Sequence, residues 1–201
     1  ARNNEFAKLD VLEQGIKEAH ERNKKFFLTV NTLPHNSKLK TFVADMEPLI
    51  AMKPDALIMA DPGLIMTVRE KWPEMPIHLS VQANTTNYWG VKFWQNIGVE
   101  RIILSRELSM EEIAEIRQEC PDIELEVFIH GALCIAYSGR CLLSGYFNHR
   151  DPNQGTCTNS CRWDYKVHNA TESDAGDAQL LQGFNFEKAQ EEANQNFEGI
   201  N

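Results

Sequence analysis

Apolar and polar positions alternate in a regular order over the first 130 residues. Stretches with apolar residues at helical spacing are separated by short apolar runs of strand propensity. Strands are predicted at 26–31, 55–61, 77–82, 101–105 and 124–129. Helices are predicted at 5–23, from a cap at Asn36 or Ser37 to about Ile50, from Asp61-Pro62, near 86–97 and at 110–119. Strands that alternate with helices in this way predict βαβ units on a parallel sheet.

Three helix ends carry recognisable capping residues. Asp61 followed by Pro62 is typical of an N-cap with proline at the first helical position. Ser109 with Glu112 forms the pattern of a capping box, and Gly98 is placed as the stop of the helix before it.

The same repeat occurs in closed barrels and in open doubly wound sheets. No GxGxxG phosphate loop is present, so we predict an α/β fold that is a partial TIM-like (β/α) barrel with five of its eight strands. Five strands cannot close such a barrel, and the chain does not begin with Met, so we expect a fragment. Residues 1–165 form the predicted incomplete barrel, with a Cys-rich loop at 131–165. Residues 166–201 form a predicted acidic, flexible tail, because seven acids and one base follow Asn169.

Polar residues stand where each predicted strand ends. In parallel α/β folds these ends form the ligand site. The residues are Asn31, Asp61, Gln82, Asn84, Arg106, Glu107 and His130. Each also has a structural interpretation: Asp61 as a helix cap, Asn31 and Asn84 as turn residues, Arg106 with Glu107 as a surface pair, and His130 as a structural histidine. Gln82 continues an apolar strand and is the hardest to explain by structure alone.

Four of the five cysteines, Cys134, Cys141, Cys157 and Cys161, fall within one stretch. The polar start shows no secretory signal, which favours a metal or an iron–sulfur cluster over disulfides. Neither close pair has the CxxC spacing of a zinc ribbon. Neighbouring glycines and hydroxyl residues can supply donors to cluster sulfurs. Cys120 lies on the apolar side of its helix and is predicted to be a core residue.

The net charge of −9 makes the chain as a whole a poor electrostatic partner for nucleic acid, although a local basic patch remains compatible with it. No apolar run reaches the roughly 18 residues of a membrane span, so we expect no membrane partner. The chain contains neither HExxH nor GxSxG, so its residues do not by themselves support proteolysis.

The Cys-rich stretch resembles the signature of the collagenase-like peptidase family of unknown catalytic type. The matching residues are Glu126, Phe128, Gly131-Ala132-Leu133-Cys134, Gly139, Cys141 and Ser144. Longer strings are similar to one bacterial branch of that family: RNNEF at 2–6, PDALIMADPGLIM at 54–66, PIHLSVQAN at 76–84, ILSRELS at 103–109 and the run from Tyr137 to Trp163.

This resemblance implies a TIM-like barrel whose third to seventh strands are present here. It also implies 5-hydroxylation of the wobble uridine of tRNA in a prephenate-dependent pathway, in the cytoplasm. A 4Fe–4S cluster on Cys134, Cys141, Cys157 and Cys161 is implied, with zinc as the alternative. Implied partners are tRNA, a small carboxylic acid such as prephenate, and possible protein subunits. Expected catalytic residues are Asn31, Gln82, Arg106, Glu107 and His130, with Arg106 facing the acid's carboxylate. A peptidase and a non-catalytic iron–sulfur subunit of a heterodimer are the alternative functions.

Overall fold

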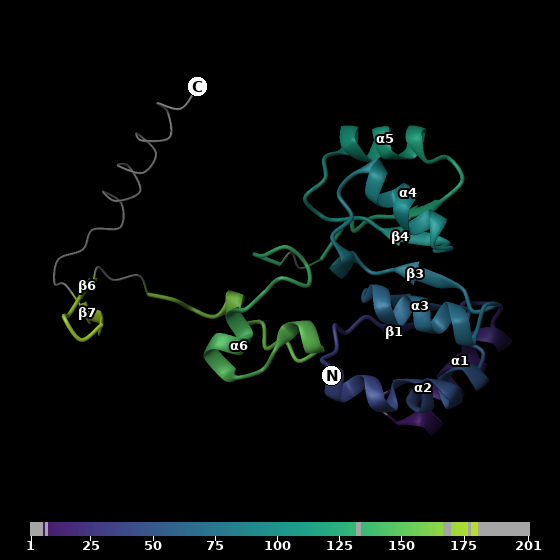
Figure 1. Cartoon of the computed structure of the whole chain (residues 1–201), viewed down its shortest axis with the longest axis horizontal. Coiled ribbons are helices and arrows are strands. Elements are labelled where there is room, and N and C mark those ends of the chain that lie inside the picture. Colours follow the sequence, from purple (N-terminus) through teal and green to yellow (C-terminus); the bar gives the residue numbers. More distant parts are fainter. Residues whose placement is uncertain (1–5, 7, 132–133, 167–169, 177, 181–201) are drawn as a thin grey trace. The chain divides into compact units, whose positions relative to one another are not determined.

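The computed structural model describes residues 6, 8–131, 134–166, 170–176 and 178–180. It divides into two compact units, residues 1–161 and 162–201, each of which is described by itself (Figure 1). The first unit holds the parallel sheet and nearly all of the Cys-rich loop. The division falls four residues before the predicted boundary at 165.

Helices and strands alternate through the first unit as the sequence predicts. The helices are α1 (Leu9–Glu21), α2 (Asn36–Ala51), α3 (Pro62–Lys71), α4 (Tyr88–Asn96), α5 (Met110–Glu119) and α6 (Leu143–Asn148). The strands are β1 (Phe27–Val30), β2 (Ala56–Met59), β3 (Ile77–Leu79), β4 (Arg101–Ile103) and β5 (Glu124–Glu126). Short 3-10 turns are η2 (Val81–Ala83), η3 (Pro152–Gln154) and η4 (Ser160–Arg162).

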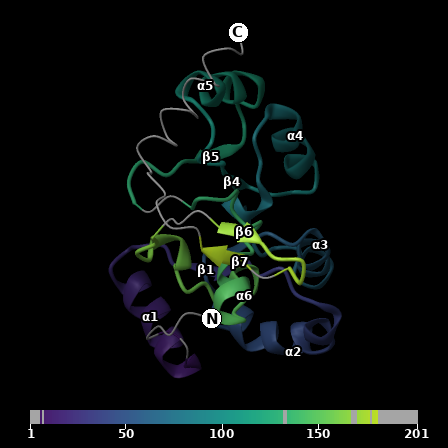
Figure 2. The same ribbon diagram turned by 90° about the vertical axis from the view of Figure 1, so that its left-hand side faces the viewer.

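The five strands form one sheet in the order β1-β2-β3-β4-β5, and all neighbouring pairs are parallel. A doubly wound sheet would reverse its order at a switch point, whereas barrel strands follow one another as these do. Figure 2 shows helices α1 to α5 along the outside of the curved sheet. The predicted class, an α/β fold with part of a TIM-like barrel, is therefore confirmed.

The core lies between the sheet and these helices. Alternate strand residues such as Leu57, Leu79 and Ile102 are fully buried and belong to one apolar cluster with Ile65 of α3 and Ile116 of α5. Successive side chains of a strand point to opposite faces. The other face of the sheet therefore carries the intervening residues, which are more polar.

The predicted caps are confirmed at two helices. The Asp61 carboxylate accepts a hydrogen bond from the Leu64 N–H at 2.9 Å, and Ser109 and Glu112 form the complete capping box. At α2 the prediction was wrong: the N-cap is His35, whose side chain makes no capping hydrogen bond.

All five strands end earlier than predicted, and β3 and β5 fall short by the most, three residues each. After Leu79, the Ser80 hydroxyl accepts the Gln82 N–H, which turns the chain into η2 and places Gln82 outside the strand. Strand β5 ends at Glu126, and Val127, Phe128 and Ile129 are 38%, 49% and 94% exposed. Among the described strands, β5 pairs only with β4, so no described strand supports it on its other side.

The second unit contains a hairpin of β6 (Ala170–Glu172) and β7 (Ala178–Leu180), paired antiparallel. The predicted acidic tail did not include this hairpin, and residues 181–201 lie outside the described part of the chain. Among the described residues, no helix is long and apolar enough to cross a membrane.

Candidate functional site

The ends of β1 and β3 are joined through one buried hydroxyl. Asn31, which follows β1, donates from Nδ2 to Ser80 Oγ at 3.0 Å. The same Oγ accepts the backbone N–H of Gln82 at 3.3 Å. Two of the predicted site residues, Asn31 and Gln82, therefore meet at Ser80, although they are 51 positions apart in the sequence.

The part of the Cys-rich loop that belongs to the first unit, called the Cys-rich segment from here on, lies against these strand ends. Asn84 Nδ2 donates to the backbone oxygens of Gln82 and Ser138, so Asn84 links β3 to the segment. Gly139 packs so closely that a Cβ there would lie 2.8 Å from the Gln82 backbone oxygen.

A second contact ties the segment to the end of β1. The Leu33 N–H donates to Asn153 O at 3.1 Å, and Gln154 Nε2 donates to Leu33 O. The loop that carries the cysteines therefore lies at the carboxyl ends of the strands, where parallel barrels bind ligands.

Arg106, just after β4, is a predicted site residue that contacts a cysteine. Its Nη1 lies 4.0 Å from Cys134 Sγ, and its guanidinium stacks over the Phe128 ring at 4.0 Å from the centroid. Glu107 and His130 are exposed, and neither makes a side-chain hydrogen bond or ion pair with a described residue. The structure thus groups Asn31 with Gln82 and Arg106 with Cys134, but adds neither Glu107 nor His130 to these groups.

Two hydroxyl residues that the sequence interpretation missed lie at the same ends. Within the described residues, five buried side-chain polar atoms have no hydrogen-bond partner, and four of them belong to Gln82, Asn84, Thr85 and Ser105. Thr85 and Ser105 are 4% and 3% exposed. Buried polar groups normally have partners, so this cluster is suited to bind a ligand or ordered water. Thr85 comes six positions after β3 and Ser105 two positions after β4, and this was the available sequence signal.

The Cys-rich segment is held together by a buried polar network. Ser144 of α6 and Ser160 are each 2% exposed. Thr158 Oγ1 lies 2.7 Å from Ser144 Oγ and 2.8 Å from Ser160 Oγ, and Asn148 Nδ2 donates to both Thr158 and Ser160. These bonds fix the stretch between Cys157 and Cys161 against α6.

All five cysteines are free thiols. Cys120 is 2% exposed and part of the apolar cluster, which confirms its predicted core role. Cys134 is exposed, and Cys141, Cys157 and Cys161 are partly buried. Four cysteine thiols are a donor set that can hold an iron–sulfur cluster. In the described part of the chain, however, no three His, Cys, Asp or Glu side chains are arranged to hold a metal ion.

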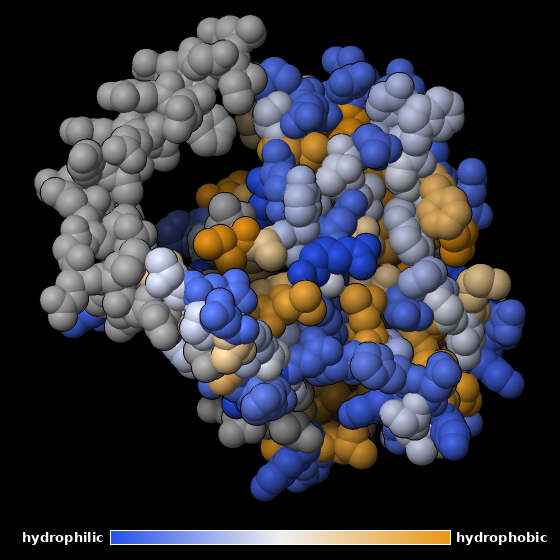
Figure 3. Space-filling view, turned by 60° about the vertical axis from the view of Figure 1, so that its left-hand side comes forward, coloured by the Kyte–Doolittle hydropathy of each residue, from blue (hydrophilic) through white to orange (hydrophobic). Residues whose placement is uncertain are grey.

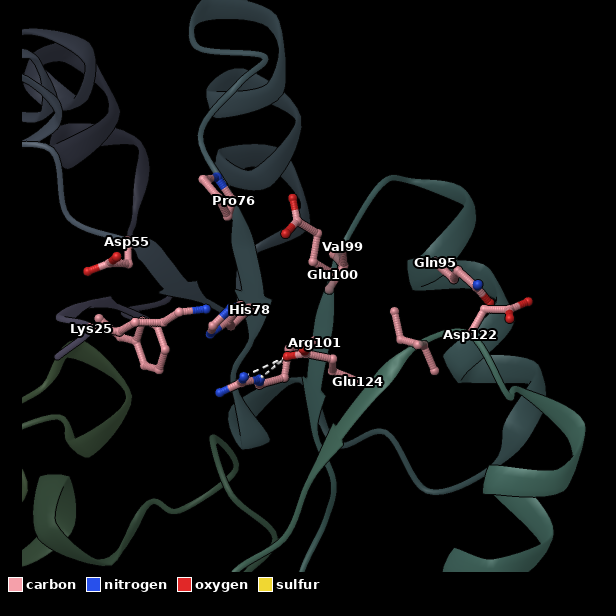
Figure 4. Close-up of a pocket in the computed structure, with 12 residues that line it drawn as sticks. Lys25, Asp55, Pro76, His78, Gln95, Val99, Glu100, Arg101, Asp122 and Glu124 are labelled. Atoms are coloured by element: carbon pink, nitrogen blue, oxygen red, sulfur yellow. Dashed lines mark hydrogen bonds and ion pairs between the residues drawn. The ribbon is translucent and has the colours of Figure 1, made fainter. Parts of the chain in front are cut away.

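A cavity of about 420 Å³ lies at the opposite, amino-terminal ends of the strands. Figure 4 shows His78 and Arg101 pointing into it, with Arg101 bonded to Glu124. Arg101 Nε and Nη2 donate to Glu124 at 2.8 and 2.6 Å, and Nη1 donates to Glu126 at 3.3 Å. All three guanidinium nitrogens donate hydrogen bonds to carboxylates of the same sheet. This network therefore has a structural role, as is usual at the amino-terminal face of such barrels.

His78 gives the protein a pH-dependent stability. It is 6% exposed and packs edge-on against Phe27, and burial, with the positive charge of Arg101, lowers the pKa of its imidazole. The unfolded chain binds this proton more readily, with a pKa of about 6.5. Stability conferred by neutral His78 is therefore present above that pH and is lost as the pH falls below it.

Urea unfolding of the full-length protein at pH 7.5 and 5.5 measures this loss. We expect it to be smaller in His78→Gln and unchanged in His35→Gln, which replaces an exposed histidine. An equal loss in the wild type and His78→Gln would contradict the assignment.

The fold and this site define an α/β barrel protein with a cysteine-rich segment at its strand ends. The chain belongs to peptidase family U32, whose family model matches residues 1–197. This confirms the resemblance to the collagenase-like peptidases. Among solved structures, the U32 peptidase Mk0906 matches with a TM-score of 0.52 and 16% identity, covering 60% of this chain and 51% of that one. That likeness concerns the fold alone.

The chain is also similar to named bacterial proteins. It is 67% identical over 175 residues to tRNA hydroxylation protein P of Haemophilus influenzae and 66% identical to that of Escherichia coli, covering 87% of this chain in each case. It is 34% identical over 167 residues to the 23S rRNA 5-hydroxycytidine C2501 synthase of Escherichia coli, covering 83% of this chain and 25% of that protein. The chain spans 38% of the length of the two tRNA hydroxylation proteins.

Proposed function

We propose that the full-length protein hydroxylates tRNA, acting as the enzyme or as one of its components at C5 of the wobble uridine. The identity of 66–67% to tRNA hydroxylation protein P supports this function. The structural observation that carries it is the contact between the Cys-rich segment and the polar strand ends, made by Asn84 to Ser138. Through that contact, the segment with the cysteines proposed as cluster ligands lies next to the proposed site for a small molecule.

In this proposal, Arg106 binds the carboxylate of a small acid such as prephenate. A guanidinium forms paired hydrogen bonds with a carboxylate, and the stacking on Phe128 holds its plane in place. Gln82 and Asn31 orient the acid from the neighbouring strand ends, and Thr85 and Ser105 offer further hydrogen bonds.

Cys134, Cys141, Cys157 and Cys161 would hold a 4Fe–4S cluster, with zinc as the alternative metal. Such a cluster supplies one-electron redox chemistry when bound. Two of the chain's own hydrogen-bond donors lie close to sulfurs of this set. Arg106 Nη1 faces Cys134 Sγ, and the Asn159 N–H lies 3.4 Å from Cys157 Sγ.

Substitution of Arg106 tests the carboxylate site. The test uses bacteria from which the gene for this protein has been deleted and into which the full-length protein is reintroduced. There, Arg106→Ala should restore roughly tenfold less 5-hydroxyuridine to tRNA than the wild type. The reason is that a hydrogen bond to a charged group contributes about 1.5–3 kcal/mol. Mass spectrometry of digested tRNA measures the product. Arg22→Ala, at the exposed C-terminal cap of α1, is the control and should behave as the wild type. Wild-type product levels in Arg106→Ala would remove Arg106 from the site.

A peptidase is the second candidate, favoured by the name of the family. Its nucleophile and base would be Cys134 and His130, which share no hydrogen bond in the described structure. Casein hydrolysis that is lost in both Cys134→Ala and His130→Ala would favour a peptidase. The third alternative is a non-catalytic iron–sulfur subunit. It would be favoured if tRNA hydroxylation were found only when the full-length protein is part of a stable heterodimer.

A further inference from the structure

Positive charge collects in one part of an otherwise acidic chain. Residues 127–166 hold four Lys or Arg and two Asp or Glu, for a net charge of +2, whereas residues 1–126 carry −5 and residues 167–201 carry −6. In the first unit the positive residues of this part are Arg140 and Arg150. Both are exposed, and neither makes a side-chain hydrogen bond or ion pair with a described residue. These two cations are therefore free to meet a negatively charged partner.

The same segment exposes aromatic and apolar side chains. Tyr146 is 79% exposed, Tyr137 55% and Phe147 44%. The Tyr146 and Phe147 rings stack edge to face at 5.2 Å between centroids. Arg140 follows Tyr137 in a tight turn closed by the Arg140 N–H and Tyr137 O. Figure 3 shows that apolar and hydrophilic groups are intermingled on the face turned toward the viewer.

We propose that this surface, defined as Tyr137, Arg140, Tyr146, Phe147 and Arg150, binds a single-stranded RNA loop. This inference rests on the proposed function and names the part of the chain that holds the substrate. Proteins that bind unpaired nucleotides combine cationic side chains, which follow the phosphates, with aromatic rings on which bases stack. Exposed tyrosines, beside arginines that form no ion pair with a described residue, provide both contacts.

The position of the surface also fits a loop substrate. It belongs to the segment that lies against the ends of β1 and β3 through Asn84 and Asn153. An unpaired base adjacent to one stacked here has a short path to those strand ends. A paired base is held inside its duplex and must be flipped out before an enzyme can reach it.

The test measures RNA affinity separately from catalysis. A fluorescent tRNA anticodon stem–loop is titrated with the full-length protein, and anisotropy gives its Kd. Tyr146→Ala should weaken binding about tenfold, because one base–aromatic stack contributes on that scale. Tyr146→Phe should retain the wild-type Kd. Trp89→Ala, which removes a 69% exposed aromatic side chain from α4, is the matched control and should have no effect.

The arginines are tested by salt dependence. Two lost phosphate contacts should reduce the slope of log K against log salt by about 1.4 in Arg140→Ala/Arg150→Ala. Arg22→Ala should leave the slope unchanged. Iron content is measured in every variant, since the arginines also lie near the candidate cluster ligands. A double variant that loses iron but keeps its RNA affinity and slope would overturn the arginine assignment.

The outcomes separate this inference from the proposed function. A wild type that hydroxylates tRNA while Tyr146→Ala binds the stem–loop normally would overturn the surface and leave the function standing. A wild type that binds the loop through Tyr146 but forms no 5-hydroxyuridine would support the surface and refute the function. Equal affinity for a fully base-paired RNA duplex would also overturn the surface, because the aromatic rings could not then be stacking on unpaired bases.

Discussion

Replacement of Cys157 by alanine is expected to remove the iron of the full-length protein and, with it, tRNA hydroxylation. The proposed cluster has four thiolate ligands on one segment, and loss of one leaves an iron atom without its protein ligand. In anaerobically purified protein, iron and sulfide should each fall from about four per chain to near zero. We expect the same of alanine at Cys134, Cys141 and Cys161.

Cys120 supplies the matched control. Its thiol is buried in the apolar cluster, where burial raises its pKa, and its sulfur contacts the Tyr88 carbonyl 3.7 Å away. A thiol of this kind is a core group and a poor metal ligand. Cys120→Ala should therefore keep full iron content while losing some stability. Zinc at one per chain in the wild type would replace the redox interpretation with a structural one.

Substitution of Gly139 by alanine is expected to displace the Cys-rich segment from the strand ends. Gly139 has φ +74°, a conformation that costs a residue with a Cβ on the order of 1 kcal/mol or more. The new Cβ would also lie 2.8 Å from the Gln82 backbone oxygen. A backbone atom cannot swing aside as a flexible side chain can, so the segment itself must move.

Gly145 in α6 tests whether this effect is specific. A Cβ there meets no atom within 4 Å, and alanine in a helix is favoured over glycine by roughly 0.5–1 kcal/mol. Limited proteolysis should therefore cut the segment faster in Gly139→Ala and at the wild-type rate in Gly145→Ala. Iron content and hydroxylation should fall only in Gly139→Ala. Wild-type protease resistance in Gly139→Ala would show that the segment does not depend on this contact.

The sequence predicted the order of elements well because the signals are local. The apolar runs of β1, β2 and β4 and the capping box at Ser109 act over a few residues. It overextended β3 and β5 for two different reasons. Ser80 turns the chain through its side chain, and β5 has a described strand on only one side. The β6–β7 hairpin in the acidic part was not predicted at all.

The candidate site was predicted in part. Asn31, Gln82 and Arg106 were chosen from their places after strands, and all three lie in contacts at the strand ends. Thr85 and Ser105 were missed, because a buried hydroxyl without a partner can be recognised only when its surroundings are known. His130 and Glu107 were also chosen because they follow predicted strands. Neither takes part in the contacts that join Asn31 with Gln82 or Arg106 with Cys134.

The sequence by itself determined the alternation of strands and helices, the cysteine spacing and the core role of Cys120, since each follows from residue types along a short stretch. Only the tertiary structure decided that the Cys-rich segment lies on the ends of β1 and β3. That placement depends on Asn84 bonding Ser138 and on Gly139 fitting against Gln82. Contacts between residues more than 50 positions apart leave no local pattern, because nothing in either stretch records which distant backbone it will meet.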